Sequence, residues 1–404
     1  MVLFALTTIG PAVFGDEPKN LIDPGLIFID TSFENASPLW YETAADGTIE
    51  VHLLYDHERG SLNRAAGHIH FQLQARPGST LTLEFKNLNN IYNGRKGSVA
   101  RELKLVVVST DGRAWRPVPL ESLPGDRVRL TIAMAGPALY VARVEPYRVS
   151  DLEAWLASIR PNPRVEITTI GKTVEGRALE IVRVGRADAP YRVFLRARAH
   201  AWEPGGNWVV EGLVGRLLAN DPDAKAYLER YCVYILPMAN KDAVARGRTR
   251  FNLRGKDLNR NWDQPADSEL APENHALETW LERMIQQGKR PHLALELHND
   301  GNGQLHVSRP PVAGLDRYLG RMKTLEGLLR EHTWFTEGST KETFRNTGTL
   351  GEGWLERYGV DAAVHEFNVN WIAGLNDYPS ARHWKRYGAD LCRVFDAYFA
   401  AVKP

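Results

Sequence analysis

The sequence predicts an α/β fold, a mixed sheet flanked by helices, preceded by an all-β sandwich. Two observations lead to this prediction. Residues 26–147 read almost wholly as short strands, in which apolar and polar side chains alternate between Gly, Asn, Asp and Pro turns. Beyond residue 149, runs of strand length alternate with stretches whose apolar residues recur at helical spacing. Alternation of this second kind is typical of a mixed or parallel sheet covered by helices.

In the first part, the strand pattern is clearest over 47–54, 68–73, 79–85, 103–108, 127–133 and 139–143. The pattern changes after Pro146, where Ser150 precedes an apolar stripe and is expected to be the N-cap of a helix. Further helices are expected over 205–220, 273–287, 314–332, 351–358 and 380–402. We therefore predict an apolar N-terminal segment (1–25), an antiparallel β-sandwich domain (26–148) and an α/β domain (149–404).

The composition is that of an ordinary globular protein. Of the 404 residues, 43% are hydrophobic and 25% are charged, and the net charge is +1. This balance argues against a nucleic-acid partner and against a polybasic membrane anchor. Cys232 and Cys392 are expected to be two buried thiols rather than a metal pair or a disulfide.

The first 15 residues form an apolar run that ends before a charged stretch. The run resembles the apolar core of a signal peptide without the basic residues that usually precede it, and it is too short for a stable membrane span. We expect a secreted or periplasmic protein, with a cytoplasmic protein as the alternative.

Polar residues that suit a zinc site follow four strand-like apolar runs. They are His200 with Glu203, Asn240, His298 and Glu366. In open α/β sheets, ligands bind at the carboxyl ends of the strands. We expect His200, Glu203 and His298 to hold one Zn²⁺ per chain, with Glu366 as the general base beside it. The alternative is a structural role for Glu366, in an ion pair with an arginine at the sheet edge.

The spacing of His200 and Glu203 is weak evidence by itself, because His275 and Glu278 repeat it. The second pair lies in an amphipathic helix and is expected to be a solvated helix face. The first pair differs because it follows a strand and directly precedes Pro204, where the next helix begins.

The other histidines fit a metal site less well. His292 starts its strand and so lies at the wrong end, and His365 is expected to point to the face opposite Glu366. His68 and His70 share one face of a sandwich strand and are expected to be packing or surface residues.

The irregular stretch 250–262 is rich in arginine and amide residues, as anion recognition requires. Asn259 and Arg260 are candidates to bind a carboxylate, and Arg250 is a candidate to stabilise an oxyanion. Asp257 is expected to orient a ligating histidine. The alternative is an arginine-rich surface loop held by local pairs.

Taken together, these pieces resemble the zinc metallocarboxypeptidases of the carboxypeptidase A type. The resemblance runs from residue 170 through 200–203, 240–247 and 250–261 to His298 and Glu366. The preceding sandwich is similar to that of the cytosolic-carboxypeptidase branch. The resemblance implies a carboxypeptidase catalytic domain over 149–404 that hydrolyses the C-terminal peptide bond of peptides or proteins.

By position, the resemblance implies the same zinc ligands and base as the residues do. It also implies that Arg250 polarises the scissile carbonyl, that Asn259 and Arg260 hold the substrate's terminal carboxylate, and that Asp257 is the partner of His200. The chain departs from the family pattern at 240–243, where a turn changes. Leu350 also stands where the cytosolic branch is expected to have an arginine, and Phe344 or another residue takes the place of a capping tyrosine.

Two other functions are alternatives to a carboxypeptidase. One is a zinc amidohydrolase or deacylase, or a hydrolase of cell-wall stem peptides, on the same fold. The other is a non-catalytic binding protein whose sandwich recruits a partner, which the full set of catalytic residue types argues against.

Overall fold

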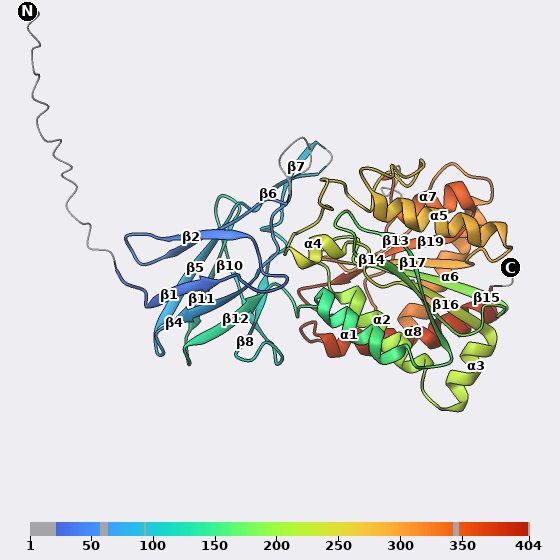
Figure 1. Cartoon of the computed structure of the whole chain (residues 1–404), viewed down its shortest axis with the longest axis horizontal. Helices are drawn as coiled ribbons and strands as arrows, with labels where there is room; N and C mark the ends of the chain where they lie inside the picture. The colour runs from blue at the N-terminus through green and yellow to red at the C-terminus, as the bar shows by residue number, and fades with distance from the viewer. Residues whose placement is uncertain (1–21, 57–63, 93, 342–346, 403–404) are drawn as a thin grey trace, which may run out of the picture.

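The structure is a computed structural model that describes residues 22–56, 64–92, 94–341 and 347–402. The apolar segment 1–15 lies outside these ranges. The chain forms a β-sandwich followed by a larger α/β part, which lie side by side in Figure 1. The predicted fold class is therefore confirmed.

The sandwich consists of two five-stranded sheets, ordered β1-β4-β12-β8-β9 and β10-β11-β5-β3-β2, and a separate β6–β7 hairpin. Inward side chains of both sheets, including Phe71 and Phe85, share one buried core. The strands are β1 Leu26–Asp30, β2 Leu39–Thr43, β3 Ile49–Leu53, β4 His70–Ala75, β5 Thr80–Lys86, β6 Asn89–Tyr92, β7 Arg95–Ser98, β8 Leu105–Ser109, β9 Arg116–Pro119, β10 Glu121–Leu123, β11 Arg127–Ala133 and β12 Ala138–Ala142.

The α/β part is built on a seven-stranded sheet, ordered β13-β14-β16-β15-β17-β19-β18. Its four central strands β16, β15, β17 and β19 run parallel, and the outer strands are antiparallel. The strands are β13 Val165–Lys172, β14 Ala178–Val184, β15 Tyr191–Ala197, β16 Tyr231–Leu236, β17 Leu293–Asp300, β18 Leu305–His306 and β19 Asp361–Asn368.

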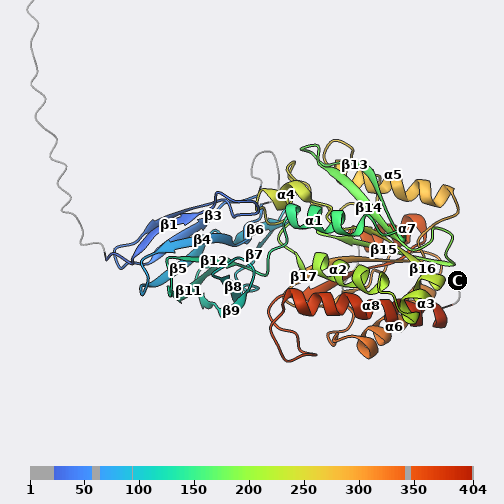
Figure 2. The ribbon, with the colours of Figure 1, turned by 60° about the horizontal axis from the view of Figure 1, so that its bottom comes forward.

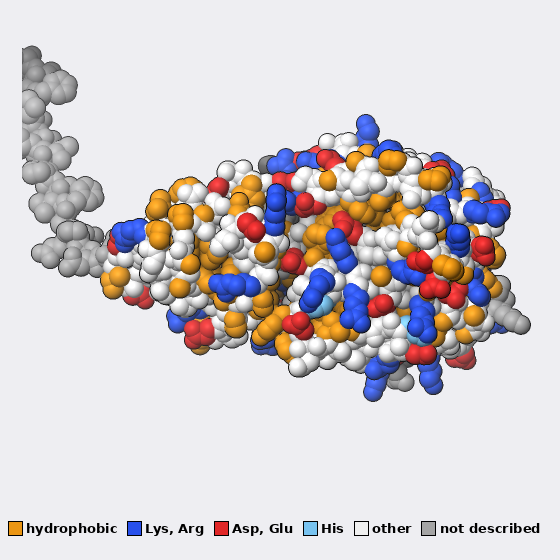
Figure 3. All heavy atoms as spheres, turned by 90° about the horizontal axis from the view of Figure 1, so that it is seen from below, with side chains coloured by type: hydrophobic (Ala, Val, Ile, Leu, Met, Phe, Trp, Pro, Cys, Tyr) orange, Lys and Arg blue, Asp and Glu red, His pale blue; other side chains and the backbone are white. Residues whose placement is uncertain are grey.

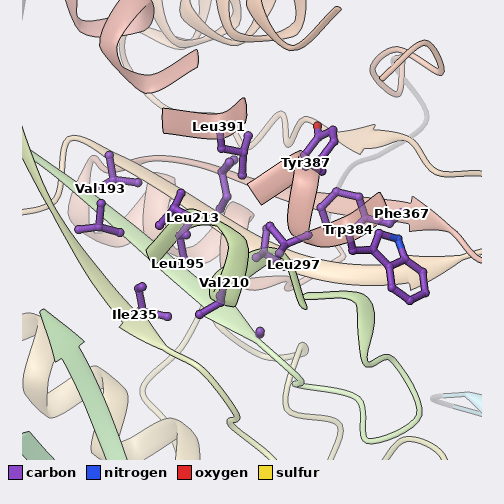
Figure 4. Packing of buried hydrophobic residues seen from close by; sticks show 14 of the residues in the cluster. Val193, Leu195, Val210, Leu213, Ile235, Leu297, Phe367, Trp384, Tyr387 and Leu391 are labelled. Atoms are coloured by element: carbon purple, nitrogen blue, oxygen red, sulfur yellow. The ribbon is translucent and has the colours of Figure 1, made fainter. Parts of the chain in front are cut away.

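Helices cover both faces of this sheet (Figure 2). Val193 and Leu195 of β15 pack with α1, α2, α6 and α8, whereas Phe194 between them packs with α5 and α7. Figure 4 shows the first of these cores. The helices are α1 Val149–Ile159, α2 Gly205–Leu217, α3 Pro222–Arg230, α4 Lys241–Ala245, α5 Pro272–Gln286, α6 Leu315–His332, α7 Leu350–Tyr358 and α8 Ala381–Ala401.

Two glycines set the close approach of α2 and α8. A Cβ on Gly212 would lie 1.8 Å from the Lys385 carbonyl oxygen, and one on Gly388 would lie 1.8 Å from the Val209 carbonyl oxygen. The two helix backbones therefore touch where these residues lack side chains.

The start of α1 differs from the expectation by two residues. Arg148, not Ser150, is the N-cap, and Asp151 accepts from the Arg148 N–H at 2.8 Å. Glu34 of the sandwich part takes over the role expected of Ser150, because its Oε1 accepts from the Val149 N–H at 2.9 Å. A cap supplied from a distant segment cannot be read from local sequence.

The surface charges, the cysteines and the helices agree with the sequence analysis. Basic and acidic side chains are interspersed over the face shown in Figure 3. Cys232 and Cys392 are both buried and unpaired. Among the described residues, no helix is both long and apolar enough to span a bilayer.

Candidate active site

The two candidate histidine ligands lie where neighbouring parallel strands end. β15 and β17 pair in register, so His200, just beyond β15, and His298, within β17, meet at one edge of the sheet. Arg198 adopts a left-handed conformation with a φ of 61° and turns the chain out of β15. Glu203 follows, directly before Pro204, the N-cap of α2.

The ligand atoms of these three residues converge on one point. Nδ1 of His200 lies 2.9 Å from Oε1 of Glu203 and 3.1 Å from Nδ1 of His298, which in turn lies 2.7 Å from Oε2 of Glu203. His200 and Glu203 are 3% exposed and His298 is fully buried. Burial would lower the pKa of His298, but the Glu203 carboxylate raises it well above its ordinary value.

This arrangement fits a metal ion. A buried carboxylate needs a positive charge beside it, and two ring nitrogens that face the same point with it form a His₂Glu set. Two imidazoles and one carboxylate are ligands that zinc accepts, and three protein ligands leave a position open for chemistry.

The far nitrogen of each ring faces a buried carboxylate. Nε2 of His200 lies 3.1 Å from Oδ1 of Asp257, and Nε2 of His298 lies 3.4 Å from Oε1 of Glu296. A proton that Nε2 of His200 shares with Asp257 keeps the lone pair of its Nδ1 free for a metal, and the Glu296 carboxylate places a negative charge beside the His298 ring. The structure thus brings Asp257 to His200, and it adds Glu296, which the sequence analysis did not single out although it stands two residues before His298 on the same strand.

Asp257 also holds Arg250. Its Oδ2 accepts from Nε of Arg250 at 2.8 Å, and the carboxylate is 2% exposed. Burial would raise the pKa of Asp257, but Arg250 and His200 together hold it well below its ordinary value. Asp257 therefore stays ionised and links the candidate oxyanion-stabilising arginine to the candidate metal site.

Glu366 lies on the next strand, in register with His298. Its Oε1 is 4.0 Å from Nε2 of His306, and its Oε2 has no hydrogen-bond partner among the described residues. Burial, reinforced by the nearby Asp300 carboxylate, raises the pKa of Glu366 well above its ordinary value. A buried carboxyl group with a raised pKa in such a site is a candidate general base.

The two candidate carboxylate-binding residues differ in their surroundings. Asn259 is 3% exposed, and its side chain is used within the protein: Oδ1 accepts from the Leu350 N–H at 2.9 Å and Nδ2 lies 3.1 Å from Nε2 of His298. Arg260 is only partly buried and donates to the Asn259 carbonyl oxygen at 2.7 Å. Of this pair, Arg260 has the more accessible side chain.

Leu350 begins α7 and is fully buried with Trp262 and Trp354. It contributes a backbone N–H to Asn259 and no charge to the site. Phe344, a further position at which the chain departs from the family pattern, lies outside the described residues.

The competing histidines are occupied elsewhere. Nδ1 of His292 accepts from the Arg192 N–H at 3.1 Å, at the opposite end of the strands. Nε2 of His365 lies 2.5 Å from the Tyr387 hydroxyl oxygen on the far side of β19, and His68 is 2.8 Å from the Asn35 carbonyl oxygen.

The repeated His-x-x-Glu motif on α5 divides between surface and interior. His275 is exposed as expected, but Glu278 is 5% exposed and pairs with Arg357. The expectation of a fully solvated face was therefore wrong for Glu278, because α7 brings its arginine against this side of α5.

Comparison with known proteins identifies this domain. The sequence profile of the zinc carboxypeptidase family matches residues 152–291. The chain contains a zinc carboxypeptidase domain. This family is zinc-dependent, and the structure holds a candidate set for the metal in His200, Glu203 and His298.

Curated relatives of the carboxypeptidase domain carry the name cytosolic carboxypeptidase. Human cytosolic carboxypeptidase 2 is 31% identical over 134 residues, which cover 30% of this chain and 15% of the relative. Cytosolic carboxypeptidase 6 of Caenorhabditis elegans is 28% identical over 198 residues, covering 44% of this chain and 43% of the relative. The chain thus spans less than half the length of either relative.

Solved structures match both the sandwich and the carboxypeptidase domain. A metallo-carboxypeptidase from Burkholderia cenocepacia superposes with a TM-score of 0.78 at 21% identity, over 93% of this chain and 99% of that one. A metallo-carboxypeptidase from Pseudomonas aeruginosa, solved in complex with (2-guanidinoethylmercapto)succinic acid, gives 0.77 at 21% identity, over 93% and 99%. At this level of identity the likeness concerns the fold.

Proposed function

We propose that this chain is a zinc metallocarboxypeptidase that hydrolyses the C-terminal peptide bond of peptides or proteins. The observation that carries the proposal is the convergence of His200, Glu203 and His298 at one sheet edge, with Glu366 in register on the adjacent strand. A metal site beside a carboxyl group of raised pKa suits water-dependent hydrolysis of an amide.

Each residue has a separate task in this reaction. Bound zinc supplies a Lewis acid and lowers the pKa of water in its open position. Glu366 takes the proton of the attacking water and returns it to the leaving amine. Arg250, held by Asp257, donates to the carbonyl oxygen as negative charge develops there. Arg260 binds the terminal carboxylate of the substrate through its guanidinium, while Asn259 supports the His298 ring.

The test is mass spectrometry of a pool of free-carboxylate peptides after incubation with zinc-loaded protein. We expect single C-terminal residues to be lost with wild type and with Glu356→Gln, an exposed glutamate on α7. We expect Glu366→Gln to lower the rate at least a hundredfold, because it removes the base. Hydrolysis by Glu366→Gln at the wild-type rate would contradict the mechanism.

An amide hydrolase of another specificity is the alternative. The Asn259 side chain contacts His298 and the Leu350 N–H within the protein. This leaves Arg260 as the main group for a substrate carboxylate. Equal turnover of peptides with free and amidated C-termini would favour an amidohydrolase, a deacylase or a hydrolase of cell-wall stem peptides. An intact pool with zinc present in the protein would do the same.

The proposal extends to the organisation of the chain. We assign residues 26–148 to a sandwich domain and 149–404 to the catalytic domain, supported by the last sandwich strand ending at Ala142 and α1 beginning at Val149. For location, the relatives' name supports the cytoplasmic alternative over export. Two unpaired thiols are in keeping with a reducing compartment. Fractionation of cells that express the full chain tests this.

A further inference from the structure

We propose that the β-sandwich is a working part of the active site, because it positions Glu203 through Trp202 and Arg250 through Asp56. Trp202 and Asp56 are positioning residues that act through the groups they hold. The inference rests on the proposed function, since it takes Glu203 to be a zinc ligand and Arg250 to be a catalytic residue. In Figures 1 and 2, β6, β7 and α4 lie at the junction of the two parts.

Trp202 lies between the candidate ligands His200 and Glu203 in the sequence, yet its ring packs in the core of the sandwich. The indole Nε1–H donates to Oε1 of Glu203 at 3.1 Å. The side chain is 4% exposed and is a member of the sandwich core. One hydrogen bond thus ties a metal-binding carboxylate to the core of the neighbouring part.

The sandwich fits this ring closely. A Cβ on Gly67 would lie 2.7 Å from Cζ3 of Trp202, so the ring occupies the space that a side chain at residue 67 would need. The guanidinium carbon of Arg143, just beyond β12, lies 3.5 Å from the indole centroid, in cation–π contact. Arg143 is itself 3% exposed, and its nitrogens have no hydrogen-bond partner among the described residues. The indole therefore has little room to turn.

Asp56, which follows β3, holds the loop that carries Arg250. Its carboxylate accepts from three successive backbone N–H groups, those of Thr249 at 2.5 Å, Arg250 and Phe251 at 3.0 Å. The Tyr92 ring of β6 lies 5.0 Å from the Arg250 guanidinium carbon. Arg250 is thus held by the sandwich at its backbone and its side chain, and by Asp257 at Nε.

Thr249 joins the two contacts into one network. Its carbonyl oxygen accepts from the backbone N–H of Trp202 at 3.0 Å, and its hydroxyl accepts from the backbone N–H of His68 at 3.2 Å. Asp56 and His68 of the sandwich therefore hold a residue that binds Trp202 directly. Metal ligands and oxyanion donors act only when they are held in a precise geometry. The sandwich therefore affects both the zinc affinity and the kcat of the enzyme.

The first experiment uses Trp202→Phe, which keeps an aromatic ring in the sandwich core but lacks the indole N–H and the second ring. We expect its zinc affinity, measured by competition with a chromogenic chelator, to fall 10- to 100-fold. Trp155→Phe, a partly buried tryptophan of α1, is the control and should bind zinc as wild type does. Wild-type zinc affinity in Trp202→Phe would overturn the inference for Glu203.

A second pair of variants acts from the sandwich alone. Gly67→Ala should weaken zinc binding by displacing the indole, whereas Gly78→Ala, which also has a positive φ but open space around it, should leave zinc binding unchanged. Equal zinc affinity in the two variants, both folded by circular dichroism, would contradict the role of the Trp202 contact.

Asp56→Asn tests the other contact, because an amide cannot accept from all three N–H groups. We expect kcat at saturating zinc to fall about 10- to 100-fold and zinc affinity to fall less than in Trp202→Phe, because Asp56 reaches Glu203 only through Thr249 and Trp202. Tyr92→Leu should lower kcat less, roughly 3- to 10-fold. Unchanged kcat in both variants would overturn the inference for Arg250. A wild-type protein that binds no zinc and cleaves no peptide would instead remove the proposed function itself.

Discussion

Nε2 of His298 lies 3.4 Å from Oε1 of Glu296, a carboxylate with no exposure to solvent. The same carboxylate pairs with the buried Arg196, whose Nη1 is 3.0 Å from it. Glu296 therefore serves both the histidine ring and the arginine beneath it. A carboxylate behind a ligating histidine fixes the ring and raises its basicity.

Replacing this carboxylate should affect binding and stability together. We expect Glu296→Gln to lower zinc affinity 10- to 100-fold, because the ring of His298 loses the negative charge beside it. It should also lower the free energy of unfolding by about 3 kcal/mol or more, because Arg196 is left buried without its partner. Chelator competition and denaturant unfolding measure the two effects. Glu356→Gln is the control, and an unchanged zinc affinity in Glu296→Gln would contradict the role of Glu296.

Asp257 touches both His200 and Arg250, so one substitution should produce two losses. We expect Asp257→Asn to lower zinc affinity 10- to 100-fold, and to lower kcat further when zinc is saturating. Titration with zinc separates the two, because excess metal restores occupancy but not the placement of Arg250. Asp263→Asn, exposed and six residues away, should behave as wild type. Full recovery of kcat at saturating zinc would argue against a link to Arg250.

Arg260 should distinguish a free carboxylate from an amide. We expect Arg260→Ala to lower kcat/KM for free-carboxylate peptides about 100-fold, in line with the roughly 1.5–3 kcal/mol of a charged hydrogen bond. Turnover of amidated peptides should change little. The control is Arg254→Ala, an exposed arginine of the same loop. An equal loss on both substrates would mean that Arg260 does not bind the terminal carboxylate.

Metal removal should lower the stability of the whole protein. Zinc binds the folded site and not the unfolded chain, so a metal concentration 1,000 times the Kd adds about 4 kcal/mol to the free energy of unfolding. We expect dialysis against a chelator to lower Tm and added Zn²⁺, but not Mg²⁺, to restore it. A Tm that does not respond to zinc would contradict a metal site at His200, Glu203 and His298.

Acid should destabilise the fold through His365. Burial, followed by the nearby His306, lowers the pKa of His365 to about 3, whereas the unfolded chain takes up this proton near pH 6.5. Protons therefore favour the unfolded chain, and stability falls as pH drops from about 6.5 towards 3. For this residue the loss at pH 5 is about 2 kcal/mol.

The variant His365→Gln keeps a group that can accept from Tyr387 and does not titrate. Denaturant unfolding at pH 5 and pH 7 should show a smaller difference than in wild type. Exposed His275→Gln should leave the difference unchanged. An undiminished pH dependence in His365→Gln would mean that His365 titrates normally in the folded protein.

Local patterns were sufficient to predict the α/β fold class and the candidate residues His200, Glu203, His298 and Glu366. Each of these follows or ends an apolar run, and parallel strands bring their carboxyl ends to one edge. Period-two alternation likewise predicted the sandwich, because a strand with one buried face must alternate.

Tertiary structure alone decided which groups support these residues. Asp56 and Arg250 are 194 positions apart, and no local pattern links a carboxylate after a sandwich strand to a loop of the carboxypeptidase domain. The same holds for the indole of Trp202, which enters the sandwich core, and for the Asn259 amide, which turns inward to His298 and Leu350. The sequence gives only the order of residues along the backbone. Buried polar groups need hydrogen-bond partners, and the folded chain supplies these from whichever segments it brings close together.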